Sequence, residues 1–149
     1  MRVKDIMTPA PVCCTTDTPL DQVARMMVEH HCGCIPVVRD PESRHLVGVV
    51  TDRDIVCRAL AQGVNPLEVG VQECMTSAPL ITTTPEATLG ECLAAMERHL
   101  LRRLPVVDPN GNCVGIVAQA DVVRAAPQAD AAEMVRTVSQ PTEESARIH

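Results

Sequence analysis

The stretch Gly-Val-Val-Thr-Asp-Arg-Asp at residues 48–54 returns in altered form as Gly-Ile-Val-Ala-Gln-Ala-Asp at residues 115–121. A second stretch, Ile-Pro-Val-Val at 35–38, returns as Leu-Pro-Val-Val at 104–107. A repeat of this length normally marks structural units that bury each other's apolar faces. Two such units usually form one pseudo-symmetric body with a cleft, and clefts bind ligands.

The same repeat divides the chain into segments. A third matching pair, Asp-Ile-Met-Thr at 5–8 and Glu-Cys-Met-Thr at 73–76, lies near the start of each copy, and only short insertions or deletions separate the copies. We therefore predict a first repeat at 1–66, a second repeat at 67–126 and a partly disordered tail at 127–149.

Composition supports a folded core and narrows the class of partner. The chain has 149 residues and 46% hydrophobic side chains, enough to bury a core. Val, Leu, Ile, Met, Ala and Cys must fill that core because there is no Phe, Tyr or Trp. The aromatic platforms on which exposed bases stack are therefore missing. The net charge of −6 argues against nucleic acid or an anionic membrane as the partner.

Neither a leader nor a membrane span is predicted. Residues 1–11 lack the apolar stretch of a signal peptide, and the longest apolar runs are too short to cross a bilayer. The eight cysteines do not form the dense framework of a small secreted protein. We interpret most of them as small buried hydrophobic residues in a reducing compartment. These observations predict a cytoplasmic protein.

Each copy predicts the same order of elements: strand, helix, strand, strand, helix. Thr18 and Pro19 are predicted as the N-cap and first residue of a helix in the first copy, and Thr88 and Glu91 form a capping-box pattern in the second. β-Branched runs predict paired strands at 35–38 with 46–51 and at 104–107 with 113–118. Further helices are predicted at 52–61, 119–126 and, in the tail, 130–138. The fold class is therefore α/β, of the α+β type.

The motif at 48–54 places a hydroxyl and a carboxylate where a strand enters a helix. Thr51 could donate a hydrogen bond to a phosphate at the helix N-terminus, and Asp54 could accept both hydroxyls of a ribose. The alternative is structural: Thr51 or Asp52 caps the helix, and Asp54 lies in its dipole-favoured first turn. The motif alone favours the structural interpretation.

The repeated motifs resemble a tandem pair of CBS domains, the module named after cystathionine β-synthase. The resemblance covers about residues 1–126. In the first copy it rests on Asp-Ile-Met-Thr, Cys-Gly-Cys-Ile-Pro-Val-Val and the motif at 48–54, and in the second on Cys-Met-Thr, Arg-Arg-Leu-Pro-Val-Val-Asp and the motif at 115–121. It implies two pseudo-symmetric repeats, packed sheet to sheet, that bind adenosine nucleotides in clefts between them. In this family the Asp of the glycine motif usually holds the ribose, the Ser or Thr approaches the phosphate, and aliphatic side chains sandwich the adenine.

The two copies differ at the residues that would hold a phosphate. The second copy keeps the carboxylate as Asp121 but has Ala118 where the first copy has Thr51. Arg102 and Arg103 align with Gly-Cys at 33–34 of the first copy. Their planar guanidinium groups suit phosphate, although a solvated loop would equally explain two arginines there.

Because sites in this family combine contacts from both repeats, we predict one competent site. Its polar contacts are expected from Thr51, Asp54, Arg102 and Arg103. The residues expected to line the base are Met75, Thr76, Pro79 and Leu80. A second site around Asp121, lined by residues 12–15 including Val12, is expected to be weaker or selective for a less phosphorylated ligand.

No catalytic or metal site is predicted. His-His-Cys-Gly-Cys at 30–34 gathers possible ligands, but it lacks the ligand spacing of structural zinc. We interpret it instead as a helix C-terminus with favourable histidines, followed by a turn into a strand. The chain has no Walker loop, nucleophile elbow or zincin motif, so neither an enzyme activity nor a required cofactor is predicted.

The sequence therefore predicts a stand-alone regulatory module that senses an adenosine nucleotide and signals occupancy by a conformational change. AMP is the first candidate ligand, with ADP and ATP as others. A homodimer and an unidentified effector protein are the expected partners. Two alternatives remain open: an interaction scaffold that acts through dimerisation, and a thiol or metal redox sensor that uses Cys32 and Cys34.

Overall fold

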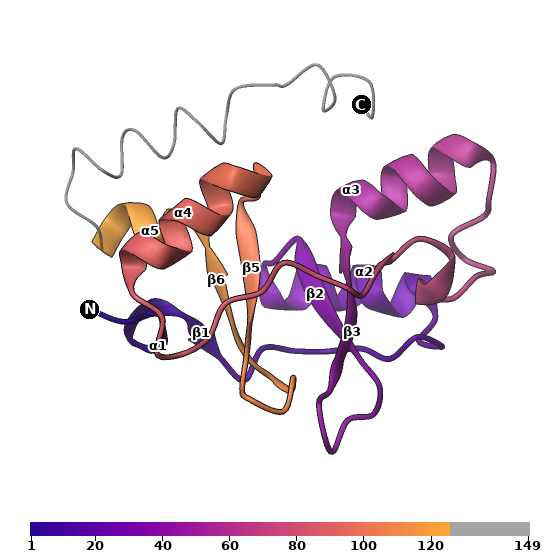
Figure 1. Ribbon diagram of the computed structural model, residues 1–149. Helices are drawn as coiled ribbons and strands as arrows, with labels where there is room; N and C mark the ends of the chain where they lie inside the picture. Colours follow the sequence, from indigo (N-terminus) through magenta and orange to yellow (C-terminus); the bar gives the residue numbers. More distant parts are fainter. Residues whose placement is uncertain (126–149) are drawn as a thin grey trace. The chain divides into compact units, whose positions relative to one another are not determined.

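The repeated sequence folds into two copies of the same element order (Figure 1). The computed structural model describes residues 1–125, so the predicted tail at 127–149, its helix at 130–138 and residue 126 lie outside the described residues. The first copy contains β1 (Thr8–Pro9), α2 (Leu20–His30), β2 (Cys34–Val38), β3 (Leu46–Thr51) and α3 (Asp52–Asp54). The second contains β4 (Thr76–Ser77), α4 (Leu89–His99), β5 (Arg103–Val107), β6 (Cys113–Ala118) and α5 (Gln119–Ala125). The predicted fold class and element order are confirmed.

The two copies exchange their short first strands. One three-stranded sheet has the order β1-β6-β5, and the other has the order β2-β3-β4. β1 pairs with β6 through Thr8 opposite Ile116, and β4 pairs with β3 through Ser77 opposite Gly48. A helical turn precedes each exchanged strand: α1 (Val3–Ile6) before β1 and η3 (Val71–Glu73) before β4. The sequence pattern predicts the strands but not their exchange, because pairing partners far apart in the chain leave no local signal.

The exchange gives two packed units that differ from the sequence repeats. Unit 1 consists of Met1–Pro9, Ile81–Val106 and the chain from Gly115, and unit 2 consists of Ala10–Leu80 and Val107–Val114. In unit 1, α5 packs against both α1 and α4, and in unit 2, α2 packs against β2. The repeat boundary between residues 66 and 67 stays a prediction about the sequence.

Aliphatic and sulfur-containing side chains fill both cores. Fully buried side chains of unit 2 include Leu20, Val23, Ile35, Val37, Val50 and Val71. Fully buried side chains of unit 1 include Val3, Cys92, Met96, Leu104, Val106, Val117 and Val122. Met27 and Met96, at equivalent places in the two copies, both face a core, as the helical spacing predicts.

Of the two long helices α2 and α4, only α4 in the second copy has the predicted cap. Thr88 Oγ1 accepts a hydrogen bond from Glu91 N at 3.1 Å, and Glu91 Oε2 accepts one from Thr88 N at 3.3 Å, so the capping box is confirmed. The predicted N-cap role of Thr18 is wrong. α2 begins at Leu20, and the Thr18 hydroxyl accepts a hydrogen bond from Thr15 N instead. Pro19 is extended because it forms a bridge with Gly70, a long-range contact that overrides the local helix signal.

The helix predicted at 52–61 is helical throughout but irregular. α3 passes into a π-helix, η1 (Ile55–Ala59), and then into a 3-10 turn, η2 (Leu60–Gln62). Gly63 ends it in the left-handed conformation, with a φ of 76° that glycine adopts without steric cost. π-Helical turns are rare and frequently mark functional sites.

Candidate ligand-binding site

β3 and α3 of unit 2 meet at a reciprocal pair of hydrogen bonds. Thr51 Oγ1 accepts a hydrogen bond from Asp54 N at 3.0 Å, and Asp54 Oδ2 accepts one from Thr51 N at 2.9 Å. This arrangement is a capping box, so the structural interpretation of the motif is confirmed.

The cap leaves polar capacity for a ligand. Thr51 uses its hydroxyl oxygen as an acceptor in the cap, so its O–H group can still donate. Asp54 uses Oδ2 in the cap, and its second oxygen, Oδ1, lies 3.8 Å from Arg58 Nε, beyond hydrogen-bond distance. The Asp54 side chain is 16% exposed, which shields the carboxylate while leaving it accessible. One donor and one acceptor therefore lie side by side at the N-terminus of α3.

Arg58 connects this turn to the segment before β4. It lies in the π-helix η1, one turn after Asp54. Its Nη1 donates to the carbonyl oxygens of Met75 at 3.1 Å and Cys74 at 3.4 Å. Sequence reasoning missed Arg58, although its position four residues after Asp54 is a signal for an ion pair along a helix.

The predicted base-lining residues divide into two groups. Met75 and Thr76 lie against the glycine motif, because a Cβ built on Gly48 would meet the Thr76 carbonyl oxygen at 2.6 Å and Met75 Cε at 3.0 Å. Leu80 instead packs in an apolar cluster with Val38. Pro79 is exposed and follows a cis peptide bond. Within unit 2, the structure therefore brings Thr51, Asp54, Met75 and Thr76 to one region.

A buried thiol packs close to this region. Burial raises the pKa of the Cys74 thiol, and the nearby Asp54 carboxylate raises it further. Cys74 is therefore a neutral, buried thiol at physiological pH and not a nucleophile.

The corresponding turn in unit 1 has hydrogen bonds on both carboxylate oxygens. Asp121 Oδ2 accepts a hydrogen bond from Ala118 N at 2.9 Å, which preserves half of the capping box. Asp121 Oδ1 accepts a short, charge-assisted hydrogen bond from Arg124 Nη2 at 2.7 Å. Ala118 supplies no hydroxyl. The two turns therefore differ in their hydrogen bonding as well as in their sequence.

Arg102 and Arg103 belong to unit 1, whereas Thr51 and Asp54 belong to unit 2. Both arginines are exposed, and neither guanidinium makes a hydrogen bond or ion pair within residues 1–125. The Arg102 carbonyl oxygen accepts a hydrogen bond from Gln119 N at 2.7 Å, which fixes the Arg102 backbone beside the start of α5. The predicted joint site of these arginines with Thr51 stays a prediction.

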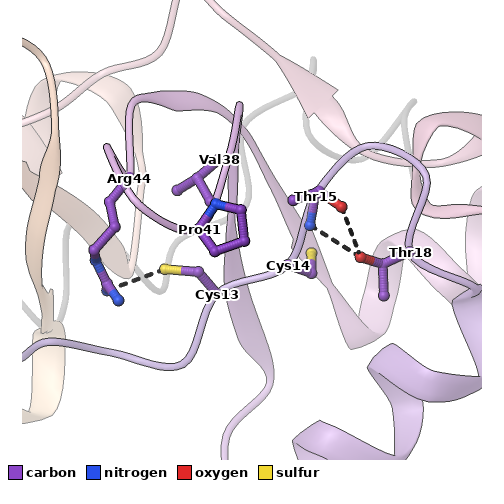
Figure 2. Close-up of a pocket in the computed structure, with 7 residues that line it drawn as sticks. All are labelled: Cys13, Cys14, Thr15, Thr18, Val38, Pro41 and Arg44. Carbon is purple, nitrogen blue, oxygen red and sulfur yellow. Dashed lines mark hydrogen bonds between the residues drawn. The ribbon is translucent and has the colours of Figure 1, made fainter.

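The segment predicted to line the second site belongs to unit 2. Val12 is half-buried against the unit 2 core. The residues after it line a cavity of about 230 Å³, whose other walls come from the end of β2 and the loop between β2 and β3 (Figure 2). The lining residues are Cys13, Cys14, Thr15, Thr18, Val38, Pro41 and Arg44. The predicted joint site of residues 12–15 with Asp121, a residue of unit 1, stays a prediction.

Residues 1–125 contain neither a candidate metal site nor a candidate membrane-spanning helix. No group of three or more His, Cys, Asp or Glu side chains within residues 1–125 is arranged to hold a metal ion. Over the same residues, no helix combines the length and the apolar character needed to cross a membrane.

Sequence comparison identifies relatives along most of the chain. The CBS domain profile matches residues 3–60 and 71–128. Hypoxic response protein 1 of Mycobacterium tuberculosis is 33% identical over 93% of this chain and 94% of its own length. CBS domain-containing protein YhcV of Bacillus subtilis is 40% identical over 80% of this chain and 81% of its own length. An uncharacterized protein of Methanopyrus kandleri is 34% identical over 83% of this chain, which spans 59% of that protein's length.

Solved structures share the fold. Hypoxic Response Protein I with two coordinated zinc ions has a TM-score of 0.75 at 34% identity, over 85% of this chain and all (100%) of that chain. The CBS domain pair of protein MJ0100 in complex with 5'-methylthioadenosine and S-adenosyl-L-methionine scores 0.73 at 29% identity, over 84% of this chain and 94% of that one. CBSX2 in complex with AMP scores 0.71 at 31% identity, over 86% and 97% of the two chains. This chain therefore belongs to the CBS domain family and carries two copies of the domain.

Proposed function

We propose that this protein is a regulatory module without catalysis that binds an adenosine nucleotide and signals its occupancy by a conformational change. The observation that carries the proposal is the Thr51–Asp54 turn, where a capping box leaves one hydroxyl donor and one carboxylate acceptor available. The ligands of CBSX2 and protein MJ0100, two members of the family, support it because AMP, 5'-methylthioadenosine and S-adenosyl-L-methionine all contain adenosine.

Each predicted site residue has a role in this proposal. Asp54 Oδ1 accepts hydrogen bonds from the ribose hydroxyls, and the Thr51 hydroxyl donates to the phosphate. Met75 and Thr76, together with Pro79 and Leu80 further along the segment, line the base. Arg102 and Arg103 supply the charge that a phosphate needs. AMP is the ligand we expect first, with ADP and ATP as competitors.

A second, weaker site is proposed around Asp121, with Val12 in its lining. Because Arg124 already donates to Asp121 Oδ1, a ribose hydroxyl would compete with a charge-assisted hydrogen bond for that oxygen. Losing such a bond costs about 1.5–3 kcal/mol, or about a 10- to 100-fold loss of affinity. We therefore propose unequal affinities at the two sites.

The same module is proposed to act as a homodimer with an effector protein. Val28 on α2 is 75% exposed, and Val56 and Leu60, one turn apart after α3, are 54% and 61% exposed. Such apolar residues on helices are suited to a protein interface. These exposed residues equally favour the second candidate function, a scaffold that dimerises without a ligand.

Calorimetry of the purified chain against AMP, ADP, ATP and NAD tests the proposal. We expect saturable binding of an adenosine nucleotide at physiological concentration, and a change of oligomeric state or hydrogen exchange when it binds. The chain has no Trp or Tyr, so a co-purified adenine would dominate its near-ultraviolet absorbance. A dimer that binds none of these compounds would refute the sensor and favour the scaffold.

Replacing Ala118 with threonine should strengthen the weaker site. The new hydroxyl can accept a hydrogen bond from Asp121 N and donate to a phosphate, as Thr51 does in the first copy. We expect about a tenfold gain in affinity at that site and a stability gain of about 1 kcal/mol. Calorimetry with two-site analysis measures the first quantity, and urea unfolding measures the second. Ala118→Ser is the matched control because it adds the hydroxyl without the methyl group.

A further inference from the structure

Three segments of unit 2 meet at the side chain of Arg44. Its Nη2 donates to the Pro11 carbonyl oxygen at 2.6 Å and to Cys13 Sγ at 3.1 Å. Its Nε donates to the Cys113 carbonyl oxygen at 3.2 Å, while its own carbonyl oxygen accepts a hydrogen bond from Cys113 N at 2.8 Å. Arg44 has a φ of 58°, a left-handed conformation that disfavours a residue with a side chain. Its hydrogen bonds to the segment with Pro11 and Cys13 and to Cys113 hold Arg44 in this conformation.

The two cysteines on either side of Arg44 contact each other. The Cys13 thiol donates a hydrogen bond to the Pro11 carbonyl oxygen at 3.3 Å, and the neighbouring Cys113 thiol raises its pKa. Both cysteine side chains pack in the apolar cluster around Val38. Cys113 is 1% exposed, whereas Cys13 is half-buried and lines the cavity of about 230 Å³. Figure 2 shows the Arg44 guanidinium directed at the Cys13 sulfur on the wall of this cavity. A small molecule in the cavity would therefore reach Cys13 first.

We propose that Cys13 and Cys113 form an oxidation site, in which a low-molecular-weight disulfide converts the thiol pair into a disulfide bond. Cys13 is the attacking residue because it lines the cavity, and Cys113 is the resolving residue because it is buried against Cys13. Arg44 is a positioning residue whose positive charge lies 3.1 Å from the sulfur that must become a thiolate. This site does not depend on the proposed nucleotide function.

The chemistry proceeds in two exchange steps. The Cys13 thiolate attacks one sulfur of the small disulfide, forms a mixed disulfide and releases one small thiolate. Cys113 then loses its proton to solvent, and its sulfur attacks Cys13 Sγ and releases the second small thiolate. The protein loses two electrons and two protons, and the small disulfide is reduced to two thiols.

The reaction is expected to be slow and selective. The neighbouring Cys113 thiol and burial raise the pKa of the Cys13 thiol, and the Arg44 guanidinium opposes them. Only a small fraction of Cys13 is therefore thiolate at neutral pH. Sustained oxidising conditions, and not a brief pulse, would close the bond.

The position of the pair gives the bond a structural consequence. Within residues 1–125 the chain crosses between the units four times, first between Pro9 and Ala10 and last between Val114 and Gly115. Cys13 lies just after the first crossing, and Cys113 lies just before the last. A disulfide between Cys13 and Cys113 would covalently link two of the chain segments that connect the units.

Incubation of the full chain with glutathione disulfide, followed by alkylation and peptide mapping, tests the proposal. In the wild type we expect a peptide pair linked through Cys13 and Cys113, with no retained glutathione. Cys113→Ala should retain glutathione on Cys13, because the second step is lost. Cys13→Ala should form no such link. Arg44→Gln should react about tenfold more slowly for each unit by which the thiol pKa rises.

Cys14→Ala is the matched control. Cys14 is adjacent to Cys13 and also lines the cavity, but its thiol points to the Pro36 carbonyl oxygen and packs in the core cluster with Ile35, not in the cluster that holds Cys13 and Cys113. This variant should form the Cys13–Cys113 link at the wild-type rate. Circular dichroism establishes that each variant is folded. Full alkylation of Cys13 and Cys113 after oxidation, or a link through Cys14 instead, would overturn the proposal.

Discussion

Asp54→Ala should lower the affinity for an adenosine nucleotide by about 10- to 100-fold, whereas Asp121→Ala should lower it far less. Asp54 has an oxygen, Oδ1, that makes no hydrogen bond within the described residues and lies beside the Thr51 hydroxyl. Asp121 has both carboxylate oxygens in use, one by Ala118 N and the other by Arg124. Removing Asp54 thus removes the proposed ligand contact, while removing Asp121 mainly removes internal hydrogen bonds.

The two variants control for each other's effect on folding. Each removes the carboxylate that accepts a hydrogen bond at 2.9 Å from the backbone N–H at the end of a strand. We therefore expect similar losses of stability, about 1 kcal/mol each. Urea unfolding measures that loss, and calorimetry well below both melting temperatures measures affinity. Equal weakening of binding by the two substitutions would contradict the unequal-site proposal, and no weakening by Asp54→Ala would contradict the ribose contact.

Local signals in the sequence predict the individual strands and helix caps, but they do not predict the exchange of first strands between the copies. The strands at 46–51 and 113–118 have the predicted bounds, because alternating burial follows directly from β-branched alternation. The Thr88–Glu91 capping box is equally local. Thr18 is not the N-cap because Pro19 forms a bridge with Gly70. Gly70 lies too far along the sequence for a local pattern around Thr18 to indicate this contact. The pairing of β1 with β6 is missed for the same reason.

The candidate site shows the same division between local and long-range information. Thr51 and Asp54 are found from one motif, and their hydrogen bonds lie within that motif. Arg58 was missed because its contacts with Met75 and Cys74 depend on a π-helical turn and on the position of the segment before β4. The Cys13–Cys113 pair was missed because the two thiols are brought together by tertiary packing around Arg44. Cys32 and Cys34, which the sequence places together, are half-buried.

Gly48→Ala should destabilise the protein by about 1–3 kcal/mol and weaken nucleotide binding as well. The new Cβ would lie 2.6 Å from the Thr76 carbonyl oxygen and 3.0 Å from Met75 Cε. The Met75 side chain can move, but the Thr76 oxygen is part of the backbone of β4, which pairs with β3 at Gly48 itself. Relief of the clash therefore has to separate the two strands, and this moves Met75 and Thr76 away from the Thr51–Asp54 turn.

Two other glycines make this prediction specific. Gly115→Ala, at the equivalent position of the second copy, would place Cβ 2.5 Å from Met7 Sδ but 3.1 Å from the nearest backbone oxygen, that of Thr8. Because a methionine side chain adapts, we expect a smaller loss of stability than for Gly48→Ala. Gly90→Ala, in α4, meets nothing closer than Thr88 Oγ1 at 3.9 Å and should stabilise the helix by up to about 1 kcal/mol. Urea unfolding of the three variants should therefore rank Gly90→Ala above Gly115→Ala and Gly48→Ala last. If Gly48→Ala were as stable as the wild type and bound nucleotide equally well, the close approach of β4 to the glycine motif would not hold the site together.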